Sequence, residues 1–159
     1  MAKSSLGTIA AMALAGGLAA AAESTGNYAT DLARVYGGYQ RILALKEACD
    51  TAIPAARAAN GKAFAAWEQQ HRALLQDLRQ RVEAMIRAAS KDKDEYVRNL
   101  GKYEGDILLQ RKEYRDLLLA LGADELRAQC QRVPETLKAA DANLARVYAA
   151  ELETLRKRK

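Results

Sequence analysis

The sequence predicts an all-α protein: an up-down-up-down bundle of four long helices, stapled at one end by a disulfide. Three observations lead to this prediction. Apolar residues recur every three or four positions over most of the chain, which is the period of a helix packed on one side. No segment alternates apolar and polar residues at period two, so strands are not expected. Two prolines and a glycine divide the apolar runs, and the two cysteines lie near these divisions.

The beginning of the chain has the order of a secretory signal peptide. A single cation, Lys3, precedes an uncharged run rich in alanine, leucine and glycine, and small residues stand at Ala20 to Ala22. We therefore interpret residues 1–22 as a signal peptide cleaved after Ala22. The rival interpretation, a membrane anchor, requires about 20 strongly apolar residues, whereas this run is short and mostly alanine and glycine. The sequence predicts export to the bacterial periplasm and a single helical domain over residues 23–159.

Proline and glycine mark where the four helices are expected to begin and end. A proline is tolerated in the first turn of a helix, so Pro54 and Pro134 indicate the starts of the second and fourth helices. Gly122 indicates the end of the third helix. Helices of roughly 20 to 35 residues with short connections are typical of an up-down-up-down bundle. The four apolar runs cover residues 28–49, 64–85, 96–121 and 137–155.

Cys49 and Cys130 are expected to form a disulfide. Thiols of exported proteins are oxidised by default. In the predicted topology the first and third connections lie at the same end of the bundle, which brings the two cysteines together. A zinc site would require three or four cysteine or histidine ligands at short spacings, and the chain has two cysteines and one histidine. A thioredoxin-like site would require a Cys-x-x-Cys pair, so we expect neither metal nor cofactor.

Aromatic residues and the single histidine on the apolar stripes are candidate binding residues. A tyrosine has a large apolar body and a hydroxyl that needs a partner when buried, so several tyrosines can line a cavity for haem, lipid or another amphipathic molecule. Such residues are more often core or rim side chains of a bundle, and we favour that interpretation. Haem attachment is not indicated, because the Cys-x-x-Cys-His motif is missing. The candidates are Tyr39, Trp67, His71, Tyr103 and Tyr114.

Glycines inside the expected helices require an explanation. Gly37 and Gly38 fall in the first helix, and Gly101 and Gly105 fall in the third. Each costs about 1 kcal/mol relative to alanine. We expect close helix packing or a bend at these positions, with a groove that admits a ligand or partner as the alternative.

The charges and motifs argue for binding rather than catalysis. A formal net charge of +5 does not require nucleic acid and suits an anionic envelope surface or an acidic protein. Most carboxylates are spaced for helical ion pairs, and neither a Gly-x-Ser-x-Gly motif nor a phosphate loop occurs. The sequence therefore predicts a non-enzymatic exported module of the bacterial cell envelope that binds another envelope protein or a second copy of itself. An exposed apolar patch would favour this function. An enclosed cavity near His71 and the core tyrosines would favour the alternative, a small-ligand carrier.

Overall fold

The computed structural model describes residues 23–157, so the expected signal peptide lies outside the described residues. The described residues are all-helical and contain no strand. Two single-turn 3₁₀ helices, η2 (Pro54–Ala56) and η3 (Ala140–Ala142), interrupt the α-helices. The α-helices are α1 (Tyr28–Ala52), α2 (Arg57–Ala88), α3 (Lys93–Leu119), α4 (Ala123–Gln131), α5 (Val133–Thr136), α6 (Leu144–Val147) and α7 (Ala149–Lys157).

The first three predicted helices form, and local sequence explains where they begin. The side chain of Asn27 caps α1 by accepting a hydrogen bond of 3.0 Å from the backbone nitrogen of Thr30. The side chain of Asp92 caps α3 in the same way, at 2.8 Å from the backbone nitrogen of Glu95. Pro54 opens the turn η2, which leads directly into α2. The prediction of an all-α protein is therefore confirmed.

The predicted fourth long helix is wrong, and the up-down-up-down arrangement of four long helices is not confirmed. The chain after Gly122 forms the short helices α4 to α7, separated by turns. The indole nitrogen of Trp67 donates to the carbonyl of Ala142 at 2.8 Å, and the backbone nitrogen of Leu144 donates to His71 Nε2 at 3.3 Å. A continuous helix would use both backbone groups internally, so these two α2 side chains stabilise the break between η3 and α6.

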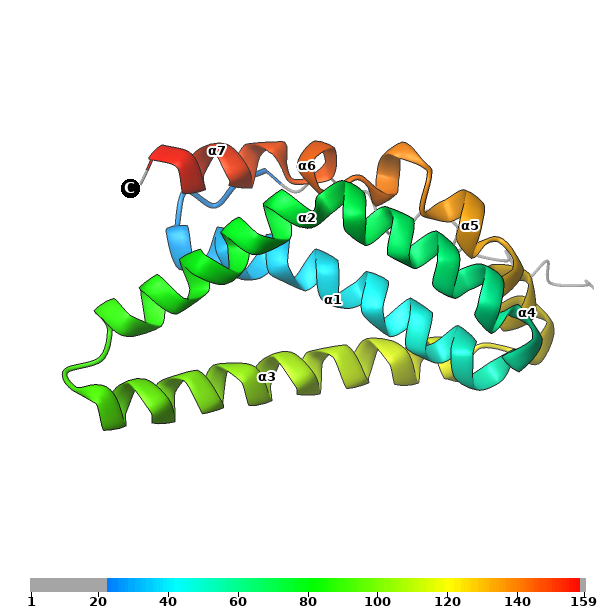
Figure 1. Cartoon of the computed structure of the whole chain (residues 1–159), viewed down its shortest axis with the longest axis horizontal. Helices are drawn as coiled ribbons and strands as arrows, with labels where there is room; N and C mark the ends of the chain where they lie inside the picture. The colour runs from blue at the N-terminus through cyan, green and yellow to red at the C-terminus, as the bar shows by residue number, and fades with distance from the viewer. Residues whose placement is uncertain (1–22, 158–159) are drawn as a thin grey trace, which may run out of the picture.

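Helix α1 occupies the centre of the fold. It contacts α2, α3, α4 and α7, and Figure 1 shows it between α2 and α3, with α5, α6 and α7 in a row along the opposite edge from α3. For this reason α1 is buried on several sides, and even its polar Asp31 and Gln40 are almost inaccessible. The hydrophobic core consists mainly of α1 and α2 side chains closed over by the short C-terminal helices.

The predicted disulfide is present and closes one end of the molecule. Cys49 in the last turns of α1 is bonded to Cys130 in α4, with their Cα atoms 5.3 Å apart. Both residues are fully buried.

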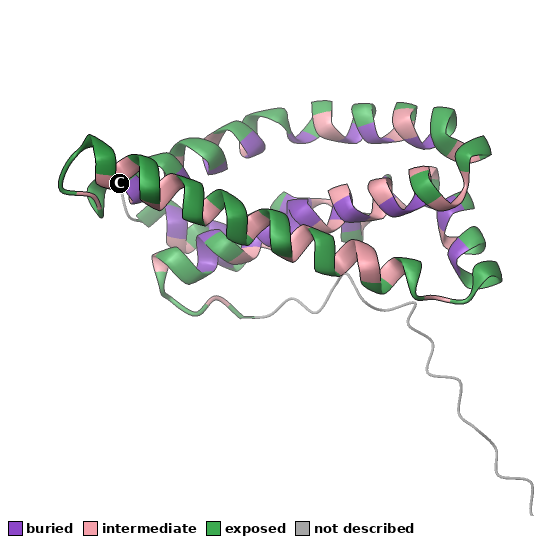
Figure 2. Cartoon of the chain, turned by 90° about the horizontal axis from the view of Figure 1, so that it is seen from below, coloured by how far each residue is buried: buried purple, intermediate pink, exposed green. Residues whose placement is uncertain are grey.

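Helix α3 is the least buried of the long helices. It has no buried residue, although Tyr96, Leu100 and Tyr103 pack partly buried against the core. Figure 2, seen from the α3 side, shows this helix in the colours of exposed and intermediate residues. Within residues 23–157, no helix is long and apolar enough to cross a membrane.

Candidate functional site

Three of the five candidate binding residues lie together in the core. The ring of Trp67 stacks on His71 one helical turn away, with centroids 4.2 Å apart, and on Tyr39 from α1, with centroids 6.2 Å apart. All three side chains are buried, and the ring of Phe64 also stacks on Trp67, with centroids 6.1 Å apart. This aromatic cluster fixes the packing of α1 on α2.

Backbone and side-chain partners satisfy the polar atoms of the aromatic cluster. Because the Leu144 N–H donates to His71 Nε2, the proton of this ring is on Nδ1, which donates to the Trp67 carbonyl at 2.8 Å. The Tyr39 hydroxyl donates to Glu68 at 2.9 Å. Burial and this carboxylate raise the pKa of Tyr39 to about 12, so the phenol stays protonated. Neither imidazole nitrogen is free to bind iron or a ligand, and the cluster has a structural role.

The other two candidate residues lie on α3 and face α1, apart from the aromatic cluster. The ring of Tyr114 lies under the guanidinium of Arg41, 4.8 Å from its centroid. The hydroxyl of Tyr103 is buried without a hydrogen-bond partner. Burial, with a smaller effect of nearby Tyr36, raises the pKa of Tyr103 to about 12. The five candidates therefore do not converge on one site.

The pocket found beside the core is lined by none of the five candidate residues. A pocket lies between α1 and the C-terminal segment, lined in part by Gly38, Ile42, Leu144 and Tyr148. It has room for about one water molecule. No group of three or more histidine, cysteine or acidic side chains suited to a metal ion occurs in the described part of the chain.

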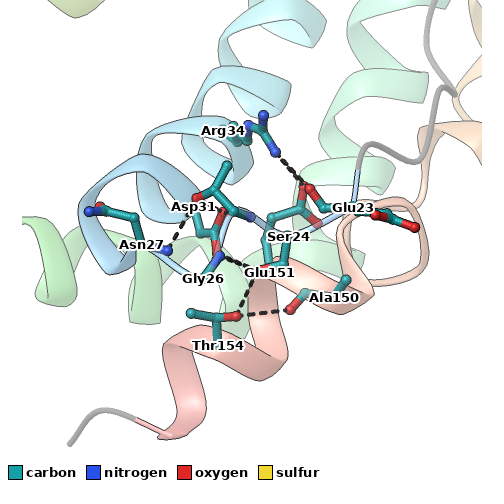
Figure 3. A network of polar contacts seen from close by, with 10 residues as sticks. Glu23, Ser24, Gly26, Asn27, Asp31, Arg34, Ala150, Glu151 and Thr154 are labelled. Carbon is teal, nitrogen blue, oxygen red and sulfur yellow. Dashed lines mark hydrogen bonds and ion pairs between the residues drawn. The ribbon is translucent and has the colours of Figure 1, made fainter.

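A buried carboxylate holds the N-terminal segment against α7. Asp31 accepts hydrogen bonds from the hydroxyl of Ser24 at 2.5 Å and from the backbone and hydroxyl of Thr25 at 2.9 and 2.8 Å. The Ser24 hydroxyl also lies 2.8 Å from that of Thr154 in α7 (Figure 3). Burial acts to raise the pKa of Asp31, but these hydrogen bonds together hold it below its ordinary value. All these groups are paired with each other, so the network is a structural clamp.

The exposed apolar residues gather on a single helix. All the large hydrophobic side chains that are exposed in the described residues belong to α3, and several expose more than half of their surface. A helix that packs on one side does not need a second apolar face. These residues are Val97 (58%), Leu108 (54%), Leu109 (57%), Leu117 (68%) and Leu119 (37%).

Two of these side chains and two glycines share one side of α3. Val97, Gly101, Gly105 and Leu108 follow each other at intervals of four, four and three residues, which places them along one row of the helix. Asp94 and Lys112 extend the row at its two ends, and all six residues are exposed. We call these six residues the outer face of α3.

The helical apolar period of α3 does not by itself predict the outer face. One apolar stripe is sufficient for a helix that packs on one side, so the stripe that contains Tyr103 and Tyr114 gives no reason to expect a second apolar face. The runs Ile107–Leu109 and Leu117–Leu119 were the available signal. Three consecutive apolar residues span most of the circumference of a helix, so some of them must point away from the core.

The outer face of α3 is therefore the candidate binding surface of the described residues. Neither a protein-family model, nor a curated protein, nor a solved structure matches this chain.

Proposed function

We propose that this chain is a non-enzymatic helical binding module of the bacterial cell envelope, exported to the periplasm, and that it recognises another macromolecule through the outer face of α3. The observation that carries the proposal is the concentration of exposed large hydrophobic residues on α3, of which Val97 and Leu108 lie on the outer face. Exposed apolar side chains cost free energy in water, of the order of 25 cal/mol for each Å². Their burial against a partner would recover that free energy, which is the usual reason for such a face.

The arrangement of the rest of the molecule is consistent with a rigid support for α3. Core aromatic residues, the Cys49–Cys130 disulfide and the Asp31 clamp are all engaged within the fold. The small-ligand carrier has less support, because the pocket beside Tyr148 has room for about one water molecule.

Site-specific crosslinking in cells tests the proposal. A photoreactive amino acid placed at Leu108 should capture a partner in the envelope fraction. The matched control is the same photoreactive residue at Ala73, an exposed position on α2. A second experiment places the photoreactive residue at position 109 and compares chains with and without Leu108→Lys. The substitution should abolish the crosslinked product, because a buried unpaired charge is unfavourable at an apolar contact. Equal products from Leu108 and Ala73, or none from either, would refute the proposal.

A further inference from the structure

We propose that the partner of the outer face of α3 is a second copy of the same chain, with the two α3 helices packed antiparallel about a twofold axis near Tyr103. This inference rests on the proposed function, because it assumes that the outer face is a binding surface. It adds the identity of the partner, the direction of the two helices and their register.

The first argument is that the folded monomer does not require the glycines of the outer face. A Cβ atom added at Gly101 or Gly105 would meet nothing within 4 Å, whereas one added at Gly38 would overlap the Tyr148 ring. Each glycine costs about 1 kcal/mol relative to alanine inside a helix. Close approach of another backbone is a standard use of glycine, and the second backbone at this exposed row must come from outside the monomer.

The second argument is that the row is complementary to itself when one copy is reversed. In a twofold antiparallel pair, each residue lies opposite another whose number is its reflection through the axis. With the axis near residue 103, Gly101 lies opposite Gly105 of the second copy, so the two small residues meet. In the same register Val97 reflects to position 109, one residue from Leu108 of the second copy, so these two exposed apolar side chains are neighbours and cover each other.

The third argument is that the charges select this direction and register. Asp94 and Lys112 are equally far from residue 103. In the antiparallel pair, Asp94 of each copy therefore lies opposite Lys112 of the other copy, at both ends of the contact. A parallel pair would instead place Asp94 beside Asp94 and Lys112 beside Lys112, which is repulsive. Lys112 already pairs with Asp116 of its own helix, but that pair is solvent-exposed and such pairs contribute little. Lys112 can therefore exchange partners at small cost.

Mixed cysteine crosslinking tests the direction and register. Both native cysteines are in the disulfide, so an added cysteine supplies the reactive thiol. A mixture of Asp94→Cys and Lys112→Cys chains should form a covalent dimer under mild oxidation. Each variant alone should not, because in the antiparallel pair two copies of the same position lie about 27 Å apart along the helix. Covalent dimers from each variant alone, to the same extent as from the mixture, would overturn the antiparallel register.

Association of the unmodified chain tests the dimer itself. One helix pair is a small interface, so we expect reversible dimers in the micromolar range by sedimentation velocity. Gly105→Gln should weaken association by about tenfold or more, because its side chain separates the two backbones. The matched control is Gly61→Gln on α2, where an added Cβ also meets nothing within 4 Å. It should leave association unchanged.

Two outcomes separate this inference from the proposed function. A chain that stays monomeric at all concentrations, while Leu108 still crosslinks to a different envelope protein, would overturn the dimer and leave the proposed function standing. Dimers that persist in Gly105→Gln would also overturn the inference, because they must use another surface. If the Leu108 crosslinked product has twice the mass of the chain and the mixed cysteine pair forms, both proposals are supported.

Discussion

Gly38 lies in the middle of α1, where the ring of Tyr148 packs directly over the helix backbone. A Cβ atom at this position would lie 2.5 Å from Cε2, 2.6 Å from the hydroxyl oxygen and 2.8 Å from Cζ of Tyr148. These distances are well inside van der Waals contact, so Gly38→Ala must displace the ring. Tyr148 follows the short helix α6 and packs against the core. Its displacement would therefore disturb the C-terminal segment as well as the ring.

The expected net effect of Gly38→Ala is a loss of stability. Overpacking costs about 1 to 3 kcal/mol, and alanine returns about 1 kcal/mol of helix propensity. We expect the free energy of unfolding to fall by up to about 2 kcal/mol, and the melting temperature by up to about 8 °C. Urea unfolding followed by circular dichroism, with the disulfide intact, measures this change.

Two controls make the Gly38 prediction specific. Gly61→Ala should raise the free energy of unfolding by about 1 kcal/mol, because its Cβ would meet nothing. Combining Gly38→Ala with Tyr148→Leu should show a favourable coupling of about 1 kcal/mol, since the smaller side chain relieves the clash. If Gly38→Ala stabilises the protein as much as Gly61→Ala does, the placement of Tyr148 over α1 is wrong.

Three further predictions concern the disulfide, the clamp and the N-terminus. Replacing Cys49 and Cys130 together by serine should lower stability by about 2 to 5 kcal/mol in urea unfolding, and thiol titration of the native oxidised protein should detect no free thiol. In the fold, the pKa of Asp31 is below its ordinary value of 3.8. The Asp31 carboxylate therefore stabilises the fold fully above pH 3.8, and this stabilisation is lost as the pH falls through the lowered pKa. Asp31→Asn should flatten the pH dependence of unfolding in that acidic range, and an unchanged slope would contradict the clamp. Intact mass of protein recovered from the periplasm should correspond to a chain that begins at Glu23, and a chain that keeps residues 1–22 would contradict the signal peptide.

The first three helices and the disulfide were predictable because local signals and topology agree there. The apolar period identified α1, α2 and α3, and Pro54 marked the turn between the first two. Pairing of Cys49 with Cys130 required only that the ends of α1 and α4 meet at one end of the molecule, which they do. The pairing did not depend on a continuous fourth helix, so the prediction was correct although that helix was not.

The break in the C-terminal segment was not predictable from periodicity. Leu137, Leu144 and Leu155 keep helical spacing, so the apolar pattern alone favours one helix. Trp67 donates a hydrogen bond to this segment and His71 accepts one from it, and these two residues, more than 70 positions earlier, stabilise a different path. A local signal was present at Asn143, whose side chain caps α6 by accepting from the backbone of Arg146. Asparagine competes with helical hydrogen bonds in this way.

The role of each glycine depended on neighbours that the sequence does not reveal. Gly38 and Gly101 both lie in helix interiors near tyrosines in the sequence, and the sequence predicts close packing or a bend at both, with a groove as the alternative. In the fold, a Cβ at Gly38 would collide with Tyr148 from a distant segment, whereas one at Gly101 would meet open space. Packing inside the monomer therefore explains the glycine at position 38 in α1, but it does not explain the glycine at position 101 in α3.

The clamp at Asp31 also sets an order of events for a chain that is delivered from its N-terminus. Ser24 is separated from its partner Thr154 by 130 residues, so nearly the whole polypeptide must be present before that contact can form. Until α7 arrives, the side of α1 that packs against it stays open to water or to a chaperone. Folding of this protein is consequently expected to finish only after the last helix is released. A chain truncated before Thr154 should lack the contact that holds the segment before α1 against α7.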